Sequence, residues 1–450
     1  MSANEFLNLA RAGMEKAGAQ GVESAESYLS HSREIEIEVR DGRIETIKSA
    51  EERGLGLRVF REKRIGFAYT TDLSPGGLDR LARDAAANAS QTAEDRFHRL
   101  PKPSASYPEL ELFDPAIPQT AIEAKVELAR RMEKAARAYD PRIKIIESAT
   151  YQDGEVEVGL VNTEGLASHY RAAVCGLYIS LTAQDGDGDS QTGFAMDFRR
   201  RLGELAPEAV GREAAERAVR MLGARTPGGG EVPAVLDPFV VVSLLGVLAP
   251  SLTGEAVQKG RSLFAGRIGQ PVASSLVTVV DDGAHPSGIR SAPCDGEGVP
   301  TGRTVLIENG VLKGFLHNTY TAAKDGSARS TGNGVRGSFK GTPEVGTTNF
   351  FLQPGDADPQ EIVADTPRGF YVTEVMGMHT ANPISGDFSV GASGLWIEDG
   401  RLAYPVRGAA IAGNIRDLLA AIDAVGRDLR FFGGTGAPTV RVSKLAVSGS

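Results

Sequence analysis

The residues most suggestive of chemistry stand in "SLTGEAVQKGRSLF", residues 251–264, as Gly254-Glu255-x-x-x-Lys259. Histidines at the two outer positions would make this stretch HExxxH, in which two imidazoles hold a metal ion and the glutamate acts on its bound water. Glycine and lysine cannot act as normal metal ligands, and a lone exposed carboxylate is a poor base at neutral pH. From the residues alone, we interpret Glu255 as the first-turn acid of a short helix that Thr253 caps.

Three histidines and one cysteine in the last part of the chain are further candidates. Imidazole and thiolate are the usual ligands of zinc, and His285, His317 and His379 could in principle form such a site together with Cys294. No two of them have short metal-ligand spacing, so we expect structural histidines and keep the three only as weak alternative ligands. A nucleophilic Cys294 would need a base beside it, which the sequence does not show, so we expect a structural thiol.

The stretch "GNGVRG", residues 332–337, matches the pattern GxGxxG. A dinucleotide site needs a strand before this pattern and a helix after it, so that backbone amides face a pyrophosphate. Both flanks, "GSARST" and "SFKGTPEVG", have loop composition. We therefore predict a mobile glycine-rich loop and no nucleotide cofactor.

The composition limits the class of protein. The chain has 450 residues, enough for two or three domains, and its net charge of −9 argues against a broad surface for nucleic acid or an anionic membrane. Two cysteines give no disulfide framework and fit a reducing compartment. The N-terminus is an amphipathic helix without signal-peptide features, and the apolar run "FVVVSLLGVLAP" is too short to span a bilayer. We expect a cytoplasmic protein.

Two modules of α+β type are predicted in the first half. In residues 1–95, the alternation of Ile35, Ile37 and Val39 with glutamates predicts a strand that turns at Asp41-Gly42, and a helix follows at about 74–90. The prolines of residues 96–118 predict an inter-domain linker. The central domain, residues 119–225, is predicted to contain a helix over 120–139, strands at 144–152, 154–162 and 172–184, and a helix over 206–222.

Both modules follow the order helix, sheet, helix. The last strand of the first contains Gly66-Phe67-Ala68 and that of the second Gly193-Phe194-Ala195, and an alanine-rich helix follows each. This similarity suggests an ancient duplication, while two unrelated modules remain the alternative.

The third predicted domain, residues 226–450, is β-rich. Asn309-Gly310 and Asp399-Gly400 predict two hairpins. Asn414 predicts the start of a helix whose apolar face continues to Val425, with Gly426 ending it. The expected fold class is thus α+β and antiparallel-sheet-rich, with N-terminal α/β modules followed by a β-rich C-terminal domain.

Longer stretches of the last domain carry a specific resemblance. The segments "GEAVQKGRSLF", "CDGEGVPTGRTVLIENGVLKGFLHNTYTAAKDG", "GTTNFFLQPGD" and "SGDFSVGASGLWIEDGRLAYPVRGAAIAGNIRDLL" resemble the TldD/PmbA metalloprotease family, in particular its PmbA (TldE) branch. The resemblance extends over essentially the whole chain, because "VRDGRIETIKSAEERGLGLRVF" and the middle segment fit the family's other two regions.

The resemblance implies a cytoplasmic heterodimeric metalloprotease that acts on unfolded or flexible peptides and processes small ones. Its TldD-type subunit holds zinc through HExxxH and a cysteine near the C-terminus. Carried over to this chain, the histidine positions fall on Gly254 and Lys259 and the glutamate on Glu255, and the tail "DAVGRDLRFFGGTGAPTVRVSKLAVSG" has no cysteine. The resemblance therefore implies a non-catalytic subunit with a vestigial Glu255, no cofactor of its own and zinc in the partner subunit.

The expected partners are a TldD-like catalytic chain or a second copy of this chain, with unfolded peptide as substrate and neither nucleic acid nor membrane. The strands could offer sheet edges to an extended peptide. Two other functions stay open: a homodimeric peptide-binding or regulatory protein without proteolytic activity, and an independent hydrolase that uses the histidine group.

Overall fold

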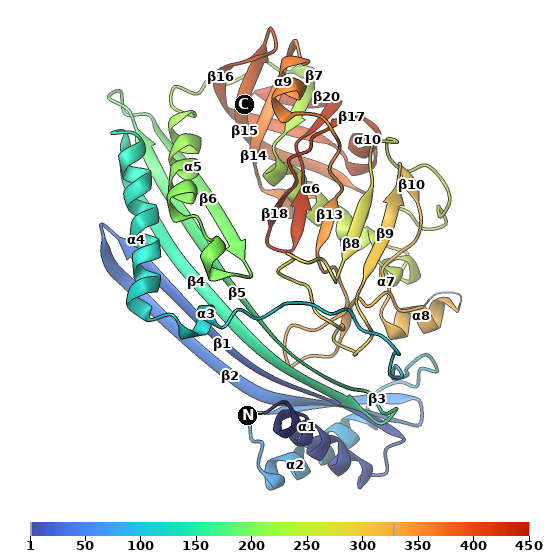
Figure 1. The fold of residues 1–450 in the computed structure, drawn as a ribbon. Coiled ribbons are helices and arrows are strands. Elements are labelled where there is room, and N and C mark those ends of the chain that lie inside the picture. Colours follow the sequence, from blue (N-terminus) through green and yellow to red (C-terminus); the bar gives the residue numbers. More distant parts are fainter. Residues whose placement is uncertain (1, 327–328, 450) are drawn as a thin grey trace.

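The computed structural model describes residues 2–326 and 329–449, and its first half builds one strongly curved antiparallel sheet (Figure 1). The strand order is β3-β2-β1-β4-β5-β6, so the segments before and after the proline-rich stretch contribute three strands each. The strands are β1 (Ser24–Arg40), β2 (Arg43–Arg61), β3 (Arg64–Thr70), β4 (Ile143–Asn162), β5 (Ala167–Gln184) and β6 (Ser190–Arg199). The boundaries of the first two predicted domains remain a prediction, and one sheet runs through both.

The helices cover one face of this sheet, and the C-terminal part of the chain lies against the other (Figure 1). Alternate side chains of a strand point to opposite faces. On β1, Leu29 packs with the cluster under α1 and α2, and Ile37 with the cluster under α4 and α5. Glu26 and Tyr28 point to the opposite face. These helices are α1 (Ala3–Gly18), α2 (Pro75–Ala89), α4 (Ile122–Tyr139) and α5 (Pro207–Val219), with the short α3 (Ala116–Gln119) and η1 (Leu202–Glu204) beside them.

The two halves of the sheet repeat the same packing. They meet at the antiparallel pair β1–β4, and each half has a helix before and after its three strands. A Cβ added at Gly66 would lie 2.0 Å from the carbonyl oxygen of Ala85, and one at Gly193 would lie 2.3 Å from that of Ala214. A glycine thus lets the helix approach the last strand at equivalent places. This agreement supports the duplication suggested by the sequence.

Two predicted strands are in fact one. We expected a break at Asp153-Gly154, whereas β4 runs from Ile143 to Asn162 without interruption. Gly154 pairs with Glu34 on β1 and with Val174 on β5. Asp153 receives a 2.7 Å hydrogen bond from Tyr151. Because these neighbours pair with both residues, the chain stays extended where we expected two separate strands.

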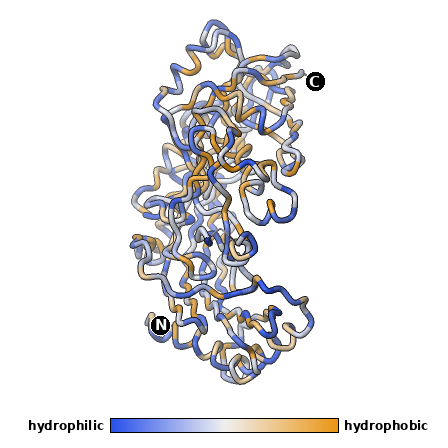
Figure 2. The backbone as a smooth tube through the Cα atoms, turned by 90° about the vertical axis from the view of Figure 1, so that its right-hand side faces the viewer, coloured by the Kyte–Doolittle hydropathy of each residue, from blue (hydrophilic) through white to orange (hydrophobic). Residues whose placement is uncertain are grey.

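The C-terminal half forms a body of two further six-stranded sheets and a small hairpin, with orders β16-β15-β14-β7-β20-β17, β10-β9-β8-β13-β19-β18 and β11-β12. Helix α6 is apolar all round and lies within their shared core. Along the tube of Figure 2, short hydrophobic and hydrophilic stretches alternate. The strands are β7 (Gly230–Leu236), β8 (Val279–Asp282), β9 (Arg303–Glu308), β10 (Val311–Leu312), β11 (Gly334–Val335), β12 (Glu344–Val345), β13 (Phe350–Leu352), β14 (Arg368–Met376), β15 (Asp387–Glu398), β16 (Arg401–Asn414), β17 (Ile422–Val425), β18 (Arg430–Phe432), β19 (Thr435–Ala437) and β20 (Val440–Gly449). The helices are α6 (Pro238–Leu248), η2 (Ala249–Leu252), α7 (Gly254–Gln258), α8 (Thr319–Asp325), α9 (Pro359–Ala364), η3 (Met378–Thr380) and α10 (Ile415–Ala420).

The predicted turns at Asp41-Gly42, Asn309-Gly310 and Asp399-Gly400 are confirmed, each with both residues at positive φ. The helix predicted to run from Asn414 to Val425 is wrong beyond Ala420. Asn414 caps α10 as expected, but Ile422–Val425 is strand β17 and pairs with β20. For residues 422–425, backbone hydrogen bonding to β20 thus decides the conformation, although the apolar spacing is typical of a helix. The α+β, antiparallel-sheet-rich class is confirmed.

Arg200, directly after β6, connects three segments of the chain. Its buried guanidinium donates to the carbonyls of Leu112 in the proline-rich stretch and Ala173 on β5 at 3.3 and 3.5 Å. It also donates to three carbonyls of the C-terminal body, of Gly288, Ile289 and Ser291, at 2.9–3.0 Å. Burial lowers the pKa of Arg200 to about 10. One cation thus fixes the curved sheet against the body.

No helix in the described parts of the chain combines the length and apolar character that crossing a bilayer requires.

Candidate functional site

Glu255 lies in a cleft between the curved sheet and the C-terminal body. The cleft has a volume of about 570 Å³, and β3, the end of α2, α7, α8 and the segment before β12 line it. Its aromatic wall includes Phe67, His98 and Tyr320, and the rings of the last two lie 5.0 Å apart. Tyr320 also donates a 2.7 Å hydrogen bond to Asp95, which ties α8 to the segment after α2.

The predicted helix around Glu255 is present but short. Thr253 caps it by accepting a hydrogen bond from the backbone N–H of Ala256 at 3.2 Å, as expected. It ends at Gln258, and Gly260 has φ +66°. The ammonium nitrogen of Lys259 lies 2.7 Å from Oε1 of Glu255, and both side chains are about half exposed. Instead of facing a metal-bound water, Glu255 forms a surface ion pair.

Gly254 is packed against a histidine. A Cβ built on Gly254 would lie 2.2 Å from Cε1 of His317, so that ring occupies the space in which a side chain at position 254 would begin. The imidazole Nδ1 lies 3.2 Å from the Thr321 hydroxyl, and burial lowers the pKa of His317. The backbone N–H of Gly254 donates to the Leu316 carbonyl at 2.8 Å.

These residues do not fit a zinc ion of the kind that the resemblance implies. Gly254 has no donor atom and Lys259 presents an ammonium that is already bound to Glu255. Among residues 2–326 and 329–449, no group of three or more His, Cys, Asp and Glu side chains could hold a metal ion. No catalytic step through a metal on this chain follows from the geometry.

The three histidines kept as alternative ligands do not come together as a site in that part of the chain. His285 packs against the rings of Phe351 and Phe431, with centroids 5.8 and 5.3 Å away. His317 belongs to the cleft beside Gly254, and His379 lies on the short helix η3. Burial raises the pKa of the Cys294 thiol to about 12, so it stays protonated as a structural thiol would.

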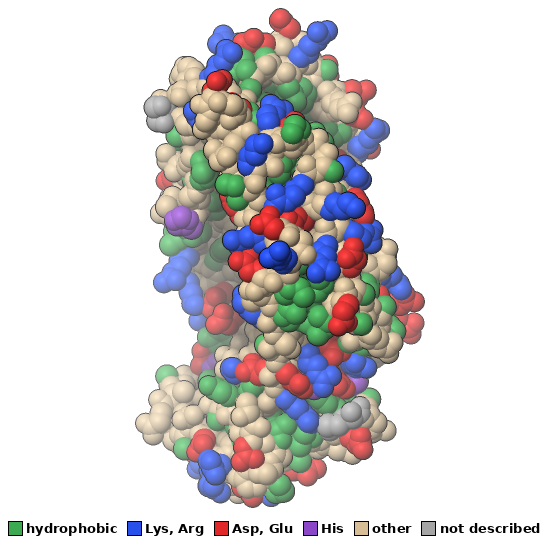
Figure 3. Space-filling view, turned by 90° about the vertical axis from the view of Figure 1, so that its left-hand side faces the viewer, with side chains coloured by type: hydrophobic (Ala, Val, Ile, Leu, Met, Phe, Trp, Pro, Cys, Tyr) green, Lys and Arg blue, Asp and Glu red, His purple; other side chains and the backbone are tan. Residues whose placement is uncertain are grey.

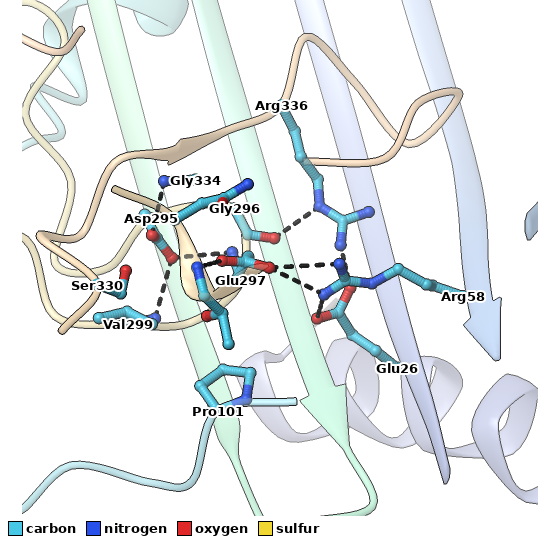
Figure 4. Close-up of polar contacts among 12 residues, drawn as sticks. Glu26, Arg58, Pro101, Asp295, Gly296, Glu297, Val299, Ser330, Gly334 and Arg336 are labelled. Atoms are coloured by element: carbon cyan, nitrogen blue, oxygen red, sulfur yellow. Dashed lines mark hydrogen bonds and ion pairs between the residues drawn. The ribbon is translucent and has the colours of Figure 1, made fainter. Parts of the chain in front are cut away.

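A buried cluster of charges lies next to the cleft, and two of its members, Arg58 and Glu297, line the cleft (Figure 4 shows the contacts within the cluster). Arg58 on β2 donates to Glu26 on β1 at 2.8 Å and to Glu297 at 3.3 Å. Arg336 binds Glu26 from the other side and donates to the Gly296 carbonyl at 2.6 Å. All four side chains are at most 7% exposed. The cluster therefore joins the curved sheet to the loops of the C-terminal body.

Asp295 completes this cluster. Its carboxylate accepts backbone hydrogen bonds from Gly334 at 2.8 Å, Glu297 at 2.9 Å and Val299 at 3.0 Å (Figure 4). Burial, followed by repulsion from Glu297, raises its pKa to about 7. Glu297 in turn accepts the N–H of Thr319 at 2.7 Å, which connects the cluster to α8 at the cleft.

The stretch 332–337, predicted as a mobile loop, is irregular apart from Gly334–Val335, but its residues are packed; its mobility remains a prediction. Asn333 is buried and donates to Asp281 at 2.8 Å, Gly334 begins strand β11, and Arg336 is part of the charge cluster. The glycines permit close packing: a Cβ at Gly334 would lie 2.9 Å from Glu297, and one at Gly332 would lie 2.4 Å from the Pro300 carbonyl. Residues 338–343 after the stretch form no helix, so its context is not that of the dinucleotide fingerprint, and the absence of a nucleotide cofactor remains a prediction.

Sequence reasoning missed the charge cluster, although one signal was present. Arg58 stands inside the apolar run "GLGLRVF", and Glu26 lies on a strand whose neighbours are buried. A charge in such a run needs a buried partner. The partners stand far away in the chain, so their identity could not be read from the sequence.

Comparisons with known proteins agree with the resemblance over the whole chain. Three family models match: PmbA/TldA metallopeptidase domain 1 over residues 25–89, the central domain over 115–222 and the C-terminal domain over 229–449. The chain is 28% identical to "Metalloprotease PmbA" of Escherichia coli O157:H7, with 95% of this chain and 92% of that one covered. It is 30% identical to a "Metalloprotease" of Methanothermobacter thermautotrophicus, with 95% and 96% covered.

Solved structures share the fold. TldE from Thermococcus kodakarensis superposes with a TM-score of 0.90 at 27% identity and with complete coverage of both chains. A protein of Thermotoga maritima described as a putative modulator of a DNA gyrase also gives 0.90, at 30% identity, over 98% of this chain and 100% of that one.

Proposed function

The chain belongs to the PmbA/TldD metallopeptidase family, and within it we propose that this protein is a non-catalytic subunit that works with a TldD-like catalytic chain on unfolded or flexible peptides. One observation carries the proposal. In the helix of the degenerate motif, Lys259 neutralises Glu255 and the His317 ring fills the space beside Gly254. The fold of a metalloprotease is thus kept around a helix that cannot hold a metal.

The charge distribution is compatible with a peptide substrate and a protein partner in the cytoplasm. On the face shown in Figure 3, basic and acidic side chains are interspersed, without a field of one sign that would favour nucleic acid.

A subunit of this kind can offer sheet edges to an extended peptide. The outer edge of β3 is obstructed, because Asn88 donates to the Phe67 carbonyl at 2.9 Å and Thr92 to the Ile65 carbonyl at 2.8 Å. The first part of β2 is different: β3 pairs with it only from Leu55 onward. Among the edges of the curved sheet, this part of β2 is where we expect a peptide or partner strand to pair.

The test is a protease assay on an unstructured fluorogenic peptide with this chain alone, a TldD-like chain alone, and both. We expect no cleavage by this chain alone and faster cleavage by the pair than by the partner alone. Elemental analysis of the purified chain should find no stoichiometric zinc. One tightly held zinc per chain, or chelator-sensitive cleavage by this chain alone, would refute the proposal in favour of an independent hydrolase.

The matched variant is Glu255→Gln in the assembled pair. Because Glu255 has no metal-bound water to act on, turnover should stay nearly unchanged, and stability should fall by only about 0.3–0.5 kcal/mol, the value of an exposed i,i+4 pair. The corresponding Glu→Gln change in the partner's HExxxH is the positive control. A loss of about 100-fold in this chain's variant, the usual contribution of a general base, would make Glu255 a working base. Peptide binding without association to a TldD-like chain would favour the homodimeric regulator.

A further inference from the structure

We propose that the hairpin of residues 332–346 is a movable partition between two cavities, held shut by the buried charge cluster and released when that cluster becomes more negative. The inference goes beyond the proposed function, because it concerns a motion of this chain alone.

The hairpin separates two hollows on the inner side of the curved sheet. Thr342–Val345 line the cleft of about 570 Å³ that contains Glu255. Arg336–Ser338, on the other leg, line a second cavity of about 470 Å³ over β1, β4 and β5. Swinging the hairpin away from the sheet would join the two into one continuous groove.

Three side chains of the hairpin contact the sheet: Lys340 forms an exposed ion pair with Glu52 on β2, and Arg336 and Phe339 are the two buried anchors. Arg336 binds Glu26 on β1 and lies 4.9 Å above the ring of Tyr28. Phe339 is only 1% exposed and rests on two glycines of β2. A Cβ at Gly54 would lie 2.3 Å from its ring, and one at Gly56 would lie 2.2 Å from its carbonyl oxygen. The glycines thus form a notch that accepts Phe339.

Apart from the buried Asn333 at its base and the Lys340–Glu52 pair, the rest of the hairpin is only lightly paired. Strands β11 and β12 have two residues each. Gly332, at its start, has φ +74°, and Cβ atoms added at Gly337 and Gly341 would meet nothing within 4 Å. Glycines at these places allow the backbone to rotate once the two anchoring side chains leave.

The ionisation state of Asp295 decides the net charge of the cluster. When Asp295 is ionised, the cluster contains three carboxylates, of Glu26, Asp295 and Glu297, against the two guanidiniums of Arg58 and Arg336. One uncompensated negative charge is then buried, which is costly. Protonation of Asp295 removes it, so the closed state is favoured by the neutral acid.

The sign of the pH effect follows from linkage. The pKa of Asp295 is raised to about 7 when the hairpin is closed, and water reaching the carboxyl on opening returns it toward about 4. The contribution of Asp295 to the stability of the closed state is therefore fully present below about pH 4 and is lost progressively as pH rises from about 4 to 7. Between about pH 4 and 7, each pH unit should favour opening by about tenfold, and above pH 7 the equilibrium should no longer change, because Asp295 is then ionised in both states.

The thiol and phenol groups around Asp295 do not titrate in this window. Burial raises the pKa of Cys294 and of Tyr28 to about 12 and that of Tyr170 well above its usual range. Burial lowers the pKa of His98, which lines the cleft together with Arg58, and burial raises the pKa of Asp281, which accepts a hydrogen bond from Asn333 of the hairpin. The Asp295→Asn variant below separates the effect of Asp295 from theirs. The titratable and charged groups that face Asp295 from the packed elements are Glu26 and Tyr28 on β1, Arg58 on β2, Tyr170 on β5, Cys294 and Glu297 on its own loop, and Arg336 on the hairpin.

Hydrogen exchange of the full-length chain tests the proposal. Protection factors of amides in residues 334–345, corrected for intrinsic exchange, should fall by about 50-fold between pH 5 and 7 and be constant from pH 8 to 9. Amides of β15, inside the body, serve as the internal reference and should not change. Equal protection of the hairpin at pH 5 and 8, or a parallel loss in β15, would overturn the proposal.

Two variants and a control make the result specific. Asp295→Asn removes the ionisation, so the hairpin should keep its protection up to pH 9. Phe339→Ala removes an anchor, so protection should fall at every pH with the pH dependence retained. Asp84→Asn, on the exposed side of α2, should behave as the wild type. A pH dependence that survives in Asp295→Asn would contradict the role of the cluster, and an unaltered hairpin in Phe339→Ala would contradict the anchor.

Discussion

At the scale of single residues, the relation between Gly254 and His317 explains why the degenerate motif cannot simply be restored. The ring of His317 stands where a side chain at 254 would start, and its hydroxyl partner Thr321 belongs to α8. The sequence indicated that the ligand positions were empty, and it indicated the Thr253 cap. It could not show that a histidine 63 positions from Gly254 fills the gap, because that contact depends on how α7 and α8 pack.

We predict that Gly254→His with Lys259→His creates no protease and destabilises the chain. The new side chain at 254 must displace His317, and overpacking of this kind costs about 1–3 kcal/mol. Positions five apart on a regular helix also diverge by roughly 140°, although α7 ends at Gln258 and leaves some freedom. Urea unfolding measures the loss of stability, zinc titration measures any metal binding, and a peptide assay measures any cleavage.

Lys259→His alone is the control and should be stable, because position 259 is exposed. The double variant should gain at most loose zinc binding, since a catalytic site needs three protein ligands and second-shell support. Cleavage that a chelator abolishes and zinc restores would show that the fold already supplies a third ligand, with His317 and His379 the first to test.

At the scale of elements, turns and caps were predictable because their signals are local. Asp41-Gly42 needs only its own two residues to favour positive φ, and Asn414 caps α10 with its own side chain. The errors arose where a distant strand decided the outcome. Ile422–Val425 became a strand because β20 was available, and Gly154 stayed extended because β1 and β5 flank it.

We predict that Gly66→Ala and Gly193→Ala destabilise the protein to a similar extent, each by about 1–3 kcal/mol. In both, the added Cβ would meet a helix carbonyl and the backbone nitrogen four residues later, Ala89 for Gly66 and Ala218 for Gly193. Gly186→Ala, where a Cβ meets nothing within 4 Å, is the control. The measurement is urea unfolding; a loss at only one of the two glycines would argue against equivalent packing in the two halves.

At the scale of the whole molecule, the sequence predicted the class and the family but not how the parts are joined. The joints consist of groups far apart in the chain: 239 positions separate Arg58 from Glu297, and 310 separate Arg336 from Glu26. No local pattern encodes such a pairing. The charge cluster and Arg200 therefore became visible only in the structure.

We predict that Arg200→Met destabilises the chain by about 3 kcal/mol or more, since several buried carbonyls would lose their donor at about 1–3 kcal/mol each. The long apolar side chain keeps much of the volume, so the loss reports the hydrogen bonds. Arg199→Met, at a neighbouring and more exposed arginine, is the control. An unchanged unfolding midpoint in Arg200→Met would mean that the other contacts suffice to join sheet and body.

The central seam of the curved sheet has a consequence for the order of folding. Each three-stranded half is a meander of neighbouring strands, whereas the β1–β4 pair joins Glu26 to Asn162. Local pairings form before distant ones, so the halves should assemble first and the seam afterwards. During synthesis on the ribosome, Glu26 and Arg58 can then form their ion pair, but Glu297 and Arg336 are added to the cluster only after they have been synthesised. The buried charge cluster thus stays incomplete until most of the chain has emerged. The C-terminal domain, which is synthesised last, supplies the residues that complete the ion pairs of the first strands.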